Sequence, residues 1–190
     1  GENELIDDDR WKGYSVPPVS NANYAWILHM ISKLSENGIA AFILANGALS
    51  GGGEEYKIRK KMIENDLVES IIILPRDVFY TTDISVTLWI INKNKTSRKN
   101  TSSRNLRNRK NEILFIDLRR SGSEFEKKFV ELTSDDIQKI KDIFQNWQDT
   151  KKNYKDIEES CRSVNIEEIK KNDFSLIPSR YIPFIDKDMN

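Results

Sequence analysis

Residues 38–92 constrain the fold more than any other stretch, because they hold three apolar runs at strand-like spacing. Residues 39–45 form a short, nearly continuous apolar run after a glycine, a pattern typical of a strand buried on both faces. Residues 69–74 form a second such run, which a proline ends. A short connection, residues 75–83, leads to a third and longer apolar run at residues 84–91.

A helical pattern at residues 54–65 separates the first two strands, which predicts an α/β fold. The first two strands should run parallel with a right-handed crossover. The short connection before the third strand makes that strand antiparallel to the second. The candidate buried positions of the intervening helix are Tyr56, Ile58, Met62 and Ile63.

The composition indicates one domain, or one domain with appendages, in a chain of 190 residues. Thirty basic and 30 acidic side chains give a formal charge of zero. The single cysteine, Cys161, excludes an internal disulfide, and a single histidine leaves no typical zinc site. No apolar run approaches the roughly 20 residues that span a bilayer, so we expect a soluble cytoplasmic protein.

The N-terminal part contains a helix that begins after Asn21, a good N-cap residue. Its apolar face comprises Tyr24, Ile27, Leu28, Ile31 and Leu34. His29 lies just off this face, and a packed or half-exposed histidine is favoured over a catalytic one. Residues 7–11 are interpreted as a surface loop, in which the consecutive aspartates at 7–9 are solvated rather than a metal site.

The C-terminal part contains a strand at residues 112–117 and two capped helices. Thr133 begins the first helix, and Asn165 begins a short second one that runs through Ile169. The polar residues 151–160 are helical or loose, and residues 172–184 should pack as irregular chain. The buried stripe of the first helix is predicted to be Ile137, Ile140, Phe144 and Trp147.

Two further segments invite a binding interpretation. The glycines at 51–53 precede a helix, but the lysine of a phosphate-binding loop and the spacing of a dinucleotide fingerprint are both missing. Loop flexibility is therefore favoured there. Residues 93–110 carry eight basic side chains and no acidic one. Such a run is typical of a solvated loop or of contact with a nucleic-acid backbone, and these interpretations are compatible.

Several motifs in order along the chain resemble the modification subunit of type I restriction–modification systems, an adenine-N6 DNA methyltransferase. Ala45 and Ser85 depart from the family pattern, which tends to have proline at these positions. The matching segments are Val16-Pro17-Pro18, residues 20–26, Asn46-Gly47, Gly52-Gly53, Glu55, residues 58–61, Leu74-Pro75, Phe79-Tyr80 with Thr82, residues 114–117, Asn172-Asp173-Phe174 and Ser179-Arg180-Tyr181.

The resemblance implies methyl transfer from S-adenosylmethionine to adenine in DNA, with a specificity subunit and a restriction subunit as partners. Two family motifs are not in this sequence: the glycine-rich cofactor turn and Asn-Pro-Pro-aromatic, which holds the target adenine. Val16-Pro17-Pro18-Val19 has neither the amide nor the aromatic ring that the second motif needs. The chain therefore resembles the C-terminal part of a catalytic domain, and we expect it to be inactive alone, without catalytic or cofactor-binding residues of its own.

By the same resemblance, residues 39–45, 69–74 and 84–91 are the fifth, sixth and antiparallel seventh strands of a Rossmann-like methyltransferase sheet. The seventh strand is expected between the other two, which leaves one edge of the fifth strand unpaired. We expect residues 1–118 to form the C-terminal part of the catalytic domain and residues 119–190 a helical extension.

The resemblance also assigns target-base stacking to the loop at residues 75–83, with Phe79 as the stacking residue and Tyr80 as the substitute. A core phenylalanine at a strand end is the alternative interpretation. Candidate contacts to the DNA backbone are Lys93, Lys95, Arg98 and Lys99. The rival functions are a non-catalytic nucleic-acid-binding or assembly module, and a small-molecule nucleotide binder that uses the glycine run.

Overall fold

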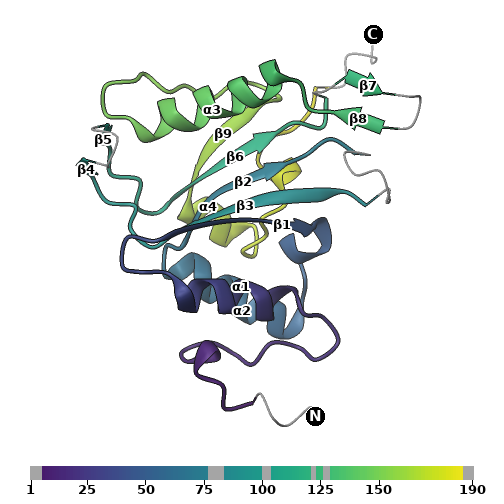
Figure 1. The fold of residues 1–190 in the computed structure, drawn as a ribbon, viewed down its shortest axis with the longest axis vertical. Coiled ribbons are helices and arrows are strands. Elements are labelled where there is room, and N and C mark those ends of the chain that lie inside the picture. The colour runs from purple at the N-terminus through teal and green to yellow at the C-terminus, as the bar shows by residue number, and fades with distance from the viewer. Residues whose placement is uncertain (1–5, 77–83, 100–103, 121–122, 126–128, 186–190) are drawn as a thin grey trace.

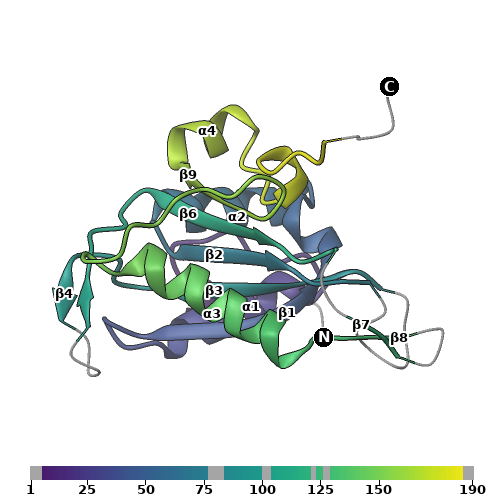
Figure 2. The same ribbon diagram turned by 90° about the horizontal axis from the view of Figure 1, so that it is seen from above.

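The structure, a computed structural model, describes residues 6–76, 84–99, 104–120, 123–125 and 129–185. A five-stranded sheet lies between two layers of helices (Figure 1 and Figure 2). Helices α1 (Asn23–Lys33) and α2 (Gly53–Glu64) cover one face, and α3 (Ser134–Gln148) covers part of the other. This arrangement confirms the predicted α/β class.

The strand order confirms the predicted insertion of a returning strand. In the order β1–β3–β2–β6–β9, β3 pairs antiparallel with both β1 and β2, so β1 and β2 run in the same direction. Strand β6 is parallel to β2, and β9 is antiparallel to β6. The strands are β1 (Ile39–Ala45), β2 (Val68–Ile73), β3 (Val86–Asn92), β6 (Glu112–Asp117) and β9 (Cys161–Asn165).

Two small hairpins lie at opposite ends of the sheet (Figure 1). The first pairs β4 (Arg98–Lys99) with β5 (Asn105–Leu106), beyond the carboxyl end of β3. The second pairs β7 (Ser123–Phe125) with β8 (Phe129–Glu131), beyond the carboxyl end of β6. Since β3 and β6 run in opposite directions, the hairpins mark the amino and carboxyl edges of the parallel strands.

The larger core lies between the sheet and α1 and α2, with Trp89 of β3 at its centre. Trp89 is fully buried, stacks on Phe42 at 6.0 Å and meets the ring of Tyr24 edge-on at 6.4 Å. The predicted apolar face of α1 is confirmed for its first four members, and Leu34 is partly buried. Asn21 is not the N-cap, which is Ala22, but its side chain accepts a hydrogen bond from the Asn23 N–H.

The predicted stripe of α3 is partly wrong. Thr133 forms the predicted N-terminal cap, as a reciprocal capping box with Asp136. Ile137 is 56% exposed, whereas Ile143, which sequence analysis did not select, is buried beside Trp147. Ile137 lies in the first turn of α3, whereas the α3 side chains that pack against the core on this face of the sheet come from Ile140 onward.

The C-terminal part is not only helical. It contains α3 and the short helix α4 (Ile166–Lys171), but also β9, which completes the main sheet and was not predicted. Asn165 caps α4 as predicted, through a hydrogen bond from the Glu167 N–H. Residues on both sides of position 118 therefore share one sheet, and a domain division at 118/119 stays a prediction.

Strand β1 is not buried on both faces, which corrects the prediction from its apolar run. Every second residue from Ile39 to Ala45 is exposed, with Ile43 at 46%. Among the described residues no strand pairs with the outer edge of β1. The side chains packed against α3 come mainly from β2, β3 and β6 rather than from β1.

Ile43 and Ile72 make a matched test of this asymmetry, because they flank Leu88 from its two sides on the same face of the sheet. Ile72 is 1% exposed. We expect Ile72→Ala to lower the free energy of unfolding of this chain by about 2–5 kcal/mol. Ile43→Ala should change it by about 0.5 kcal/mol or less. Urea titration followed by circular dichroism measures both, and equal losses would contradict the exposed position of β1.

Candidate functional site

The carboxyl ends of β1, β2 and β6 meet at one edge of the sheet, where α/β proteins bind ligands. The loop at residues 75–83 leaves β2 at this edge and returns as β3 (Figure 1). Its described ends are fixed, because Pro75 is buried and the Leu74 N–H donates to the Val86 carbonyl at 3.1 Å. Phe79 and Tyr80 lie outside the described residues, so their stacking role stays a prediction.

Asn46, the residue that follows β1, joins this edge to β3. Its N–H donates to the Ser85 carbonyl at 3.1 Å, and its side-chain oxygen accepts from the Thr87 hydroxyl at 2.5 Å. The end of β1 is thereby held beside the start of β3. In the sequence, Asn46 stands out only as part of a segment that resembles the family, and no local pattern predicts this contact.

Asp117, the last residue of β6, is closed off from solvent at the same edge. Its carboxylate accepts hydrogen bonds from Arg119 at 2.6 to 3.1 Å and is 0% exposed. Arg119 and Arg120 both lie over the ring of Phe184, at 4.4 and 4.1 Å. These contacts hold the C-terminal segment against the carboxyl end of β6.

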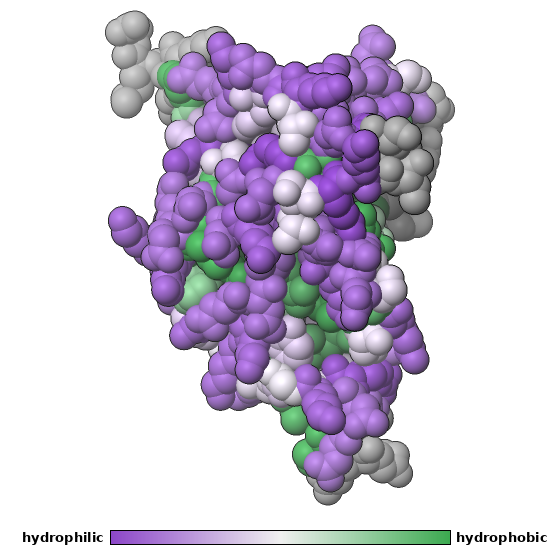
Figure 3. Space-filling view, turned by 90° about the vertical axis from the view of Figure 1, so that its left-hand side faces the viewer, coloured by the Kyte–Doolittle hydropathy of each residue, from purple (hydrophilic) through white to green (hydrophobic). Residues whose placement is uncertain are grey.

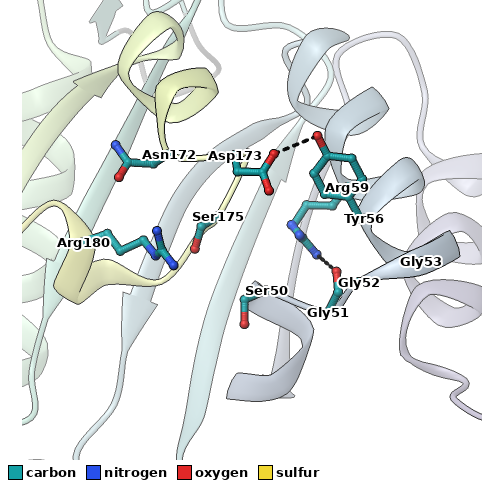
Figure 4. A pocket seen from close by; sticks show the side chains of 10 residues that line it. All are labelled: Ser50, Gly51, Gly52, Gly53, Tyr56, Arg59, Asn172, Asp173, Ser175 and Arg180. Carbon is teal, nitrogen blue, oxygen red and sulfur yellow. Dashed lines mark hydrogen bonds between the residues drawn. The ribbon is translucent and has the colours of Figure 1, made fainter.

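A pocket of about 360 Å³ lies between the glycine run and the C-terminal segment (Figure 4). Arg59 of α2 crosses the junction: it donates to the carbonyls of Phe174 at 2.9 Å and Gly51 at 2.8 Å. Tyr56 donates to Asp173 at 3.1 Å. Arg59 is 2% exposed, so this guanidinium is a structural bridge between segments that are far apart in sequence.

Local geometry, rather than loop flexibility, explains why two positions beside this pocket are occupied by glycine. Gly53 has a φ of +59°, in the region that favours glycine. A Cβ at Gly51 would lie 1.7 Å from a carboxylate oxygen of Glu55. Glu54 and Glu55 occupy the first turn of α2, where negative charge complements the helix dipole. The pocket therefore gives no support to the nucleotide-binding interpretation of the glycine run.

The basic segment 93–110 lies at the other edge of the sheet. Lys95 is not available to DNA in this structure, because its side chain is 0% exposed and its ammonium contacts Asp66 at 2.6 Å. Two carbonyls, of Val68 and Glu112, accept from it as well. Burial lowers the pKa of Lys95, and the nearby Asp66 carboxylate opposes that shift.

Arg109 is the second internal cation of this segment, and its partner Glu69 is also fully buried. Arg109 Nε donates to Glu69 at 2.9 Å, and Asn92 and Gln148 donate to the same carboxylate at 2.7 and 3.1 Å. This pair was not predicted. Glu69 lies in a strand predicted to be buried, and a buried carboxylate needs a cationic partner. The basic residues at 93–110 could have supplied that partner.

The remaining predicted DNA contacts are more accessible. Lys93 and Lys99 are exposed, although Lys93 donates to the Leu34 carbonyl at 2.9 Å, and Arg98 is half-buried. Strand β3 separates these residues from the loop at 75–83. Seven residues of strand span roughly 23 Å, so the described ends of that loop, Pro75 and Ile84, lie at the other end of β3 from these cations.

Asp8 and His29, the candidate metal-binding and catalytic residues near the N-terminus, make local contacts. Asp8 accepts from Arg10, and these hydrogen bonds lower the pKa of Asp8 to about 2. His29 lies 3.5 Å from Arg10 and edge-on to Trp26. The predicted surface loop here also contains a buried residue, Trp11, in a short 3₁₀ helix.

Removing the buried carboxylate tests whether internal ion pairs hold the basic segment. Glu69→Ala should lower the free energy of unfolding by about 3–5 kcal/mol, because it leaves Arg109 buried and uncompensated. Glu112→Ala removes the half-exposed partner of Arg107 and should cost about 0–1 kcal/mol. Chemical denaturation compares the two variants, and similar small losses would show that the buried pair contributes little.

Comparison with known proteins agrees with this architecture. The family model described as "N-6 DNA Methylase" matches residues 1–188. The HindI type I restriction enzyme methylase subunit of Haemophilus influenzae is 42% identical over 98% of this chain and 41% of its own length. The MjaIX methylase subunit of Methanocaldococcus jannaschii is 39% identical over 90% of this chain and 29% of its own length.

Solved structures give the same result. The methyltransferase subunit of a type I restriction–modification system from Streptococcus thermophilus superposes with a TM-score of 0.80 at 28% identity. The match covers 95% of this chain and 34% of that subunit. The chain thus spans less than half the length of these relatives. The match to the family model over residues 1–188 shows that the chain belongs to the N-6 DNA methylase family.

Proposed function

We propose that the intact protein containing this chain is the modification subunit of a type I restriction–modification system, which methylates adenine N6 in DNA. The observation that carries this proposal is the 42% identity to a methylase subunit over 98% of the chain. The intact protein, combined with its specificity subunit, should transfer a labelled methyl group from S-adenosylmethionine to duplex DNA. Recovery of N6-methyladenine tests the proposal, and unmodified DNA would contradict it.

Within that activity, this chain supplies the loop that receives the extruded base. Enzymes that modify a base take it out of the duplex and give its faces new partners. The loop at 75–83 leaves the carboxyl edge of the sheet, where such a base would arrive. We propose Phe79 as the residue that stacks on the adenine and Tyr80 as its substitute.

The cofactor, by this proposal, is held mainly by parts of the intact protein outside this chain. The sequence contains neither a glycine-rich cofactor turn nor an Asn-Pro-Pro-aromatic motif. The outer edge of β1, which no described strand pairs with, and its exposed Ile39 and Ile43 offer the surface on which the rest of the sheet would continue. Exposed apolar side chains along a strand edge are a hazard unless they are covered.

Partners and location follow from the same proposal. The specificity subunit would choose the DNA sequence, and the restriction subunit would join the assembly. Among the described residues no helix is long and apolar enough to cross a membrane, and we propose that the intact protein acts on DNA in the cytoplasm.

A non-catalytic nucleic-acid-binding or assembly module is the second candidate. The exposed Lys93 and Lys99, at the edge of the sheet opposite the base loop, favour it. Contacts from Lys93, Arg98 and Lys99 to the DNA backbone would serve either function. Lys95 is buried and paired with Asp66, which argues against a DNA contact by Lys95. Methyl transfer by the intact protein separates the two candidates.

The isolated 190-residue chain is not expected to bind S-adenosylmethionine. Titration calorimetry should give no saturable heat with the isolated chain and a clear isotherm with the intact protein. Micromolar binding to the isolated chain would contradict the proposed location of the cofactor site.

Phe79→Ala in the intact protein should weaken capture of the extruded adenine by about 1–3 kcal/mol, the typical contribution of base–aromatic stacking. Fluorescence of 2-aminopurine at the target position reports that capture. The melting temperature should hardly change, and Tyr80→Ala in the same assay tests the substitute stacking residue. A core phenylalanine would instead cost about 3–5 kcal/mol of stability, which would remove Phe79 from the site.

A further inference from the structure

A cavity of about 530 Å³ lies at the amino edge of the sheet, between the β4–β5 hairpin, the end of α3 and the start of β1. Figure 3 looks onto this end of the molecule: hydrophilic side chains cover most of it, and apolar ones are visible between them. Three described lining residues are cationic, Arg98, Lys99 and Arg104, and none of the described lining residues is acidic. The cavity therefore carries an excess of positive charge.

Arg98 supplies the most specific observation. Its Nε atom is buried and has no hydrogen-bond partner among the described residues. A buried polar donor without an acceptor costs free energy, and the cost is larger for a charged group. An anion inside the cavity would provide an acceptor for this Nε–H.

The protein's own acceptors near the cavity are already used. Arg104 donates to the side-chain oxygen of Gln148 at 3.3 Å, while the Gln148 amide nitrogen donates to Glu69 at 3.1 Å. Glu69 in turn is compensated by Arg109. This buried carboxylate is thus paired with Arg109, which does not line the cavity.

The cavity walls are also held in place. The Arg107 N–H donates to the Gln148 carbonyl at 2.8 Å, and the Thr150 N–H donates to the Asn105 carbonyl at 2.9 Å. These bonds attach β5 to the end of α3. Phe144 adds a half-buried aromatic wall. A site whose walls are fixed before binding loses less conformational entropy when a ligand enters.

We propose that this cavity binds a phosphate group through Arg98 and Lys99, with Arg104 adding positive charge. Guanidinium groups suit phosphate because they present paired donors to its oxygens. The phosphate belongs either to a DNA backbone or to a free nucleotide or pyrophosphate. If the phosphate belongs to DNA, the inference rests on the proposed function; if it belongs to a small molecule, it does not. The site lies at the edge of the sheet opposite the loop at 75–83.

The test uses the intact protein with Arg98→Gln, Lys99→Gln and the double variant. Lys110→Gln is the matched control, since Lys110 is an exposed cation of the same segment that does not line the cavity. Titration calorimetry with pyrophosphate and fluorescence anisotropy with labelled duplex DNA provide the two binding measurements. Neither requires methyl transfer, so a failure here is distinct from a failure of the proposed function.

Each cavity variant should lower the affinity for the phosphate ligand that binds there by about tenfold or more, which corresponds to the loss of one charge-assisted hydrogen bond. For a DNA backbone, the slope of log affinity against log salt should also fall by about 1 for each cation removed. Loss of pyrophosphate binding alone identifies a small phosphate ligand. Arg98→Lys, which keeps the charge, should retain more affinity than Arg98→Gln and guards against a folding defect.

Two results would overturn the proposal. Equal losses in the cavity variants and in Lys110→Gln would show a diffuse charge effect rather than a site. Unchanged affinity for both probes, with or without a lower melting temperature, would show that the cavity does not receive phosphate.

Discussion

The antiparallel insertion of β3 between β1 and β2 is the constraint on which the functional arrangement depends. Backbone hydrogen bonds on both sides of β3 fix the direction of its neighbours. The loop before β3 must then leave from the carboxyl edge of the sheet, and the segment after β3 must begin at the amino edge. The described ends of the loop at 75–83 and the start of the basic segment at Lys93 are therefore held at opposite ends of a strand that spans roughly 23 Å.

Buried ion pairs decide which cations of the basic segment face solvent. Lys95 and Arg109 are drawn inward by Asp66 and Glu69. Glu69 and the two cations would each be costly to bury alone, and Asp66 remains partly exposed. The pairs attach residues 95 and 109 to the start of β2, where Asp66 and Glu69 lie. Arg98, Lys99 and Arg104, between those two anchors, line the cavity instead.

A second long-range junction joins the start of α2 to the segment that follows α4. Arg59 bonds the carbonyls of Gly51 and Phe174, and the Leu176 N–H donates to the Leu49 carbonyl at 2.9 Å. The segment after α4 has little regular structure of its own, so these bonds and the burial of Phe174, Leu176 and Tyr181 hold it in place. The sequence motifs at these positions thus have a packing role in addition to their family resemblance.

The sequence by itself determined the local elements, because apolar periodicity and capping residues act over a few neighbours. The helices α1 and α2, the strands β2, β3 and β6, and the caps at Thr133 and Asn165 all follow from such patterns. The resemblance added the order of strands and the family. Strand β9 was not predicted because it is short, from Cys161 to Asn165, and its largely polar residues show no strand pattern.

Only the tertiary structure decided which apolar and charged side chains are buried. The run in β1 looks like a central strand, yet exposure depends on neighbours that the run itself does not encode. Lys95 and Arg109 look like surface cations, yet their partners lie about 30 to 40 positions away along the chain. Burial and pairing are properties of chain segments brought together in space, and local sequence patterns do not contain that information.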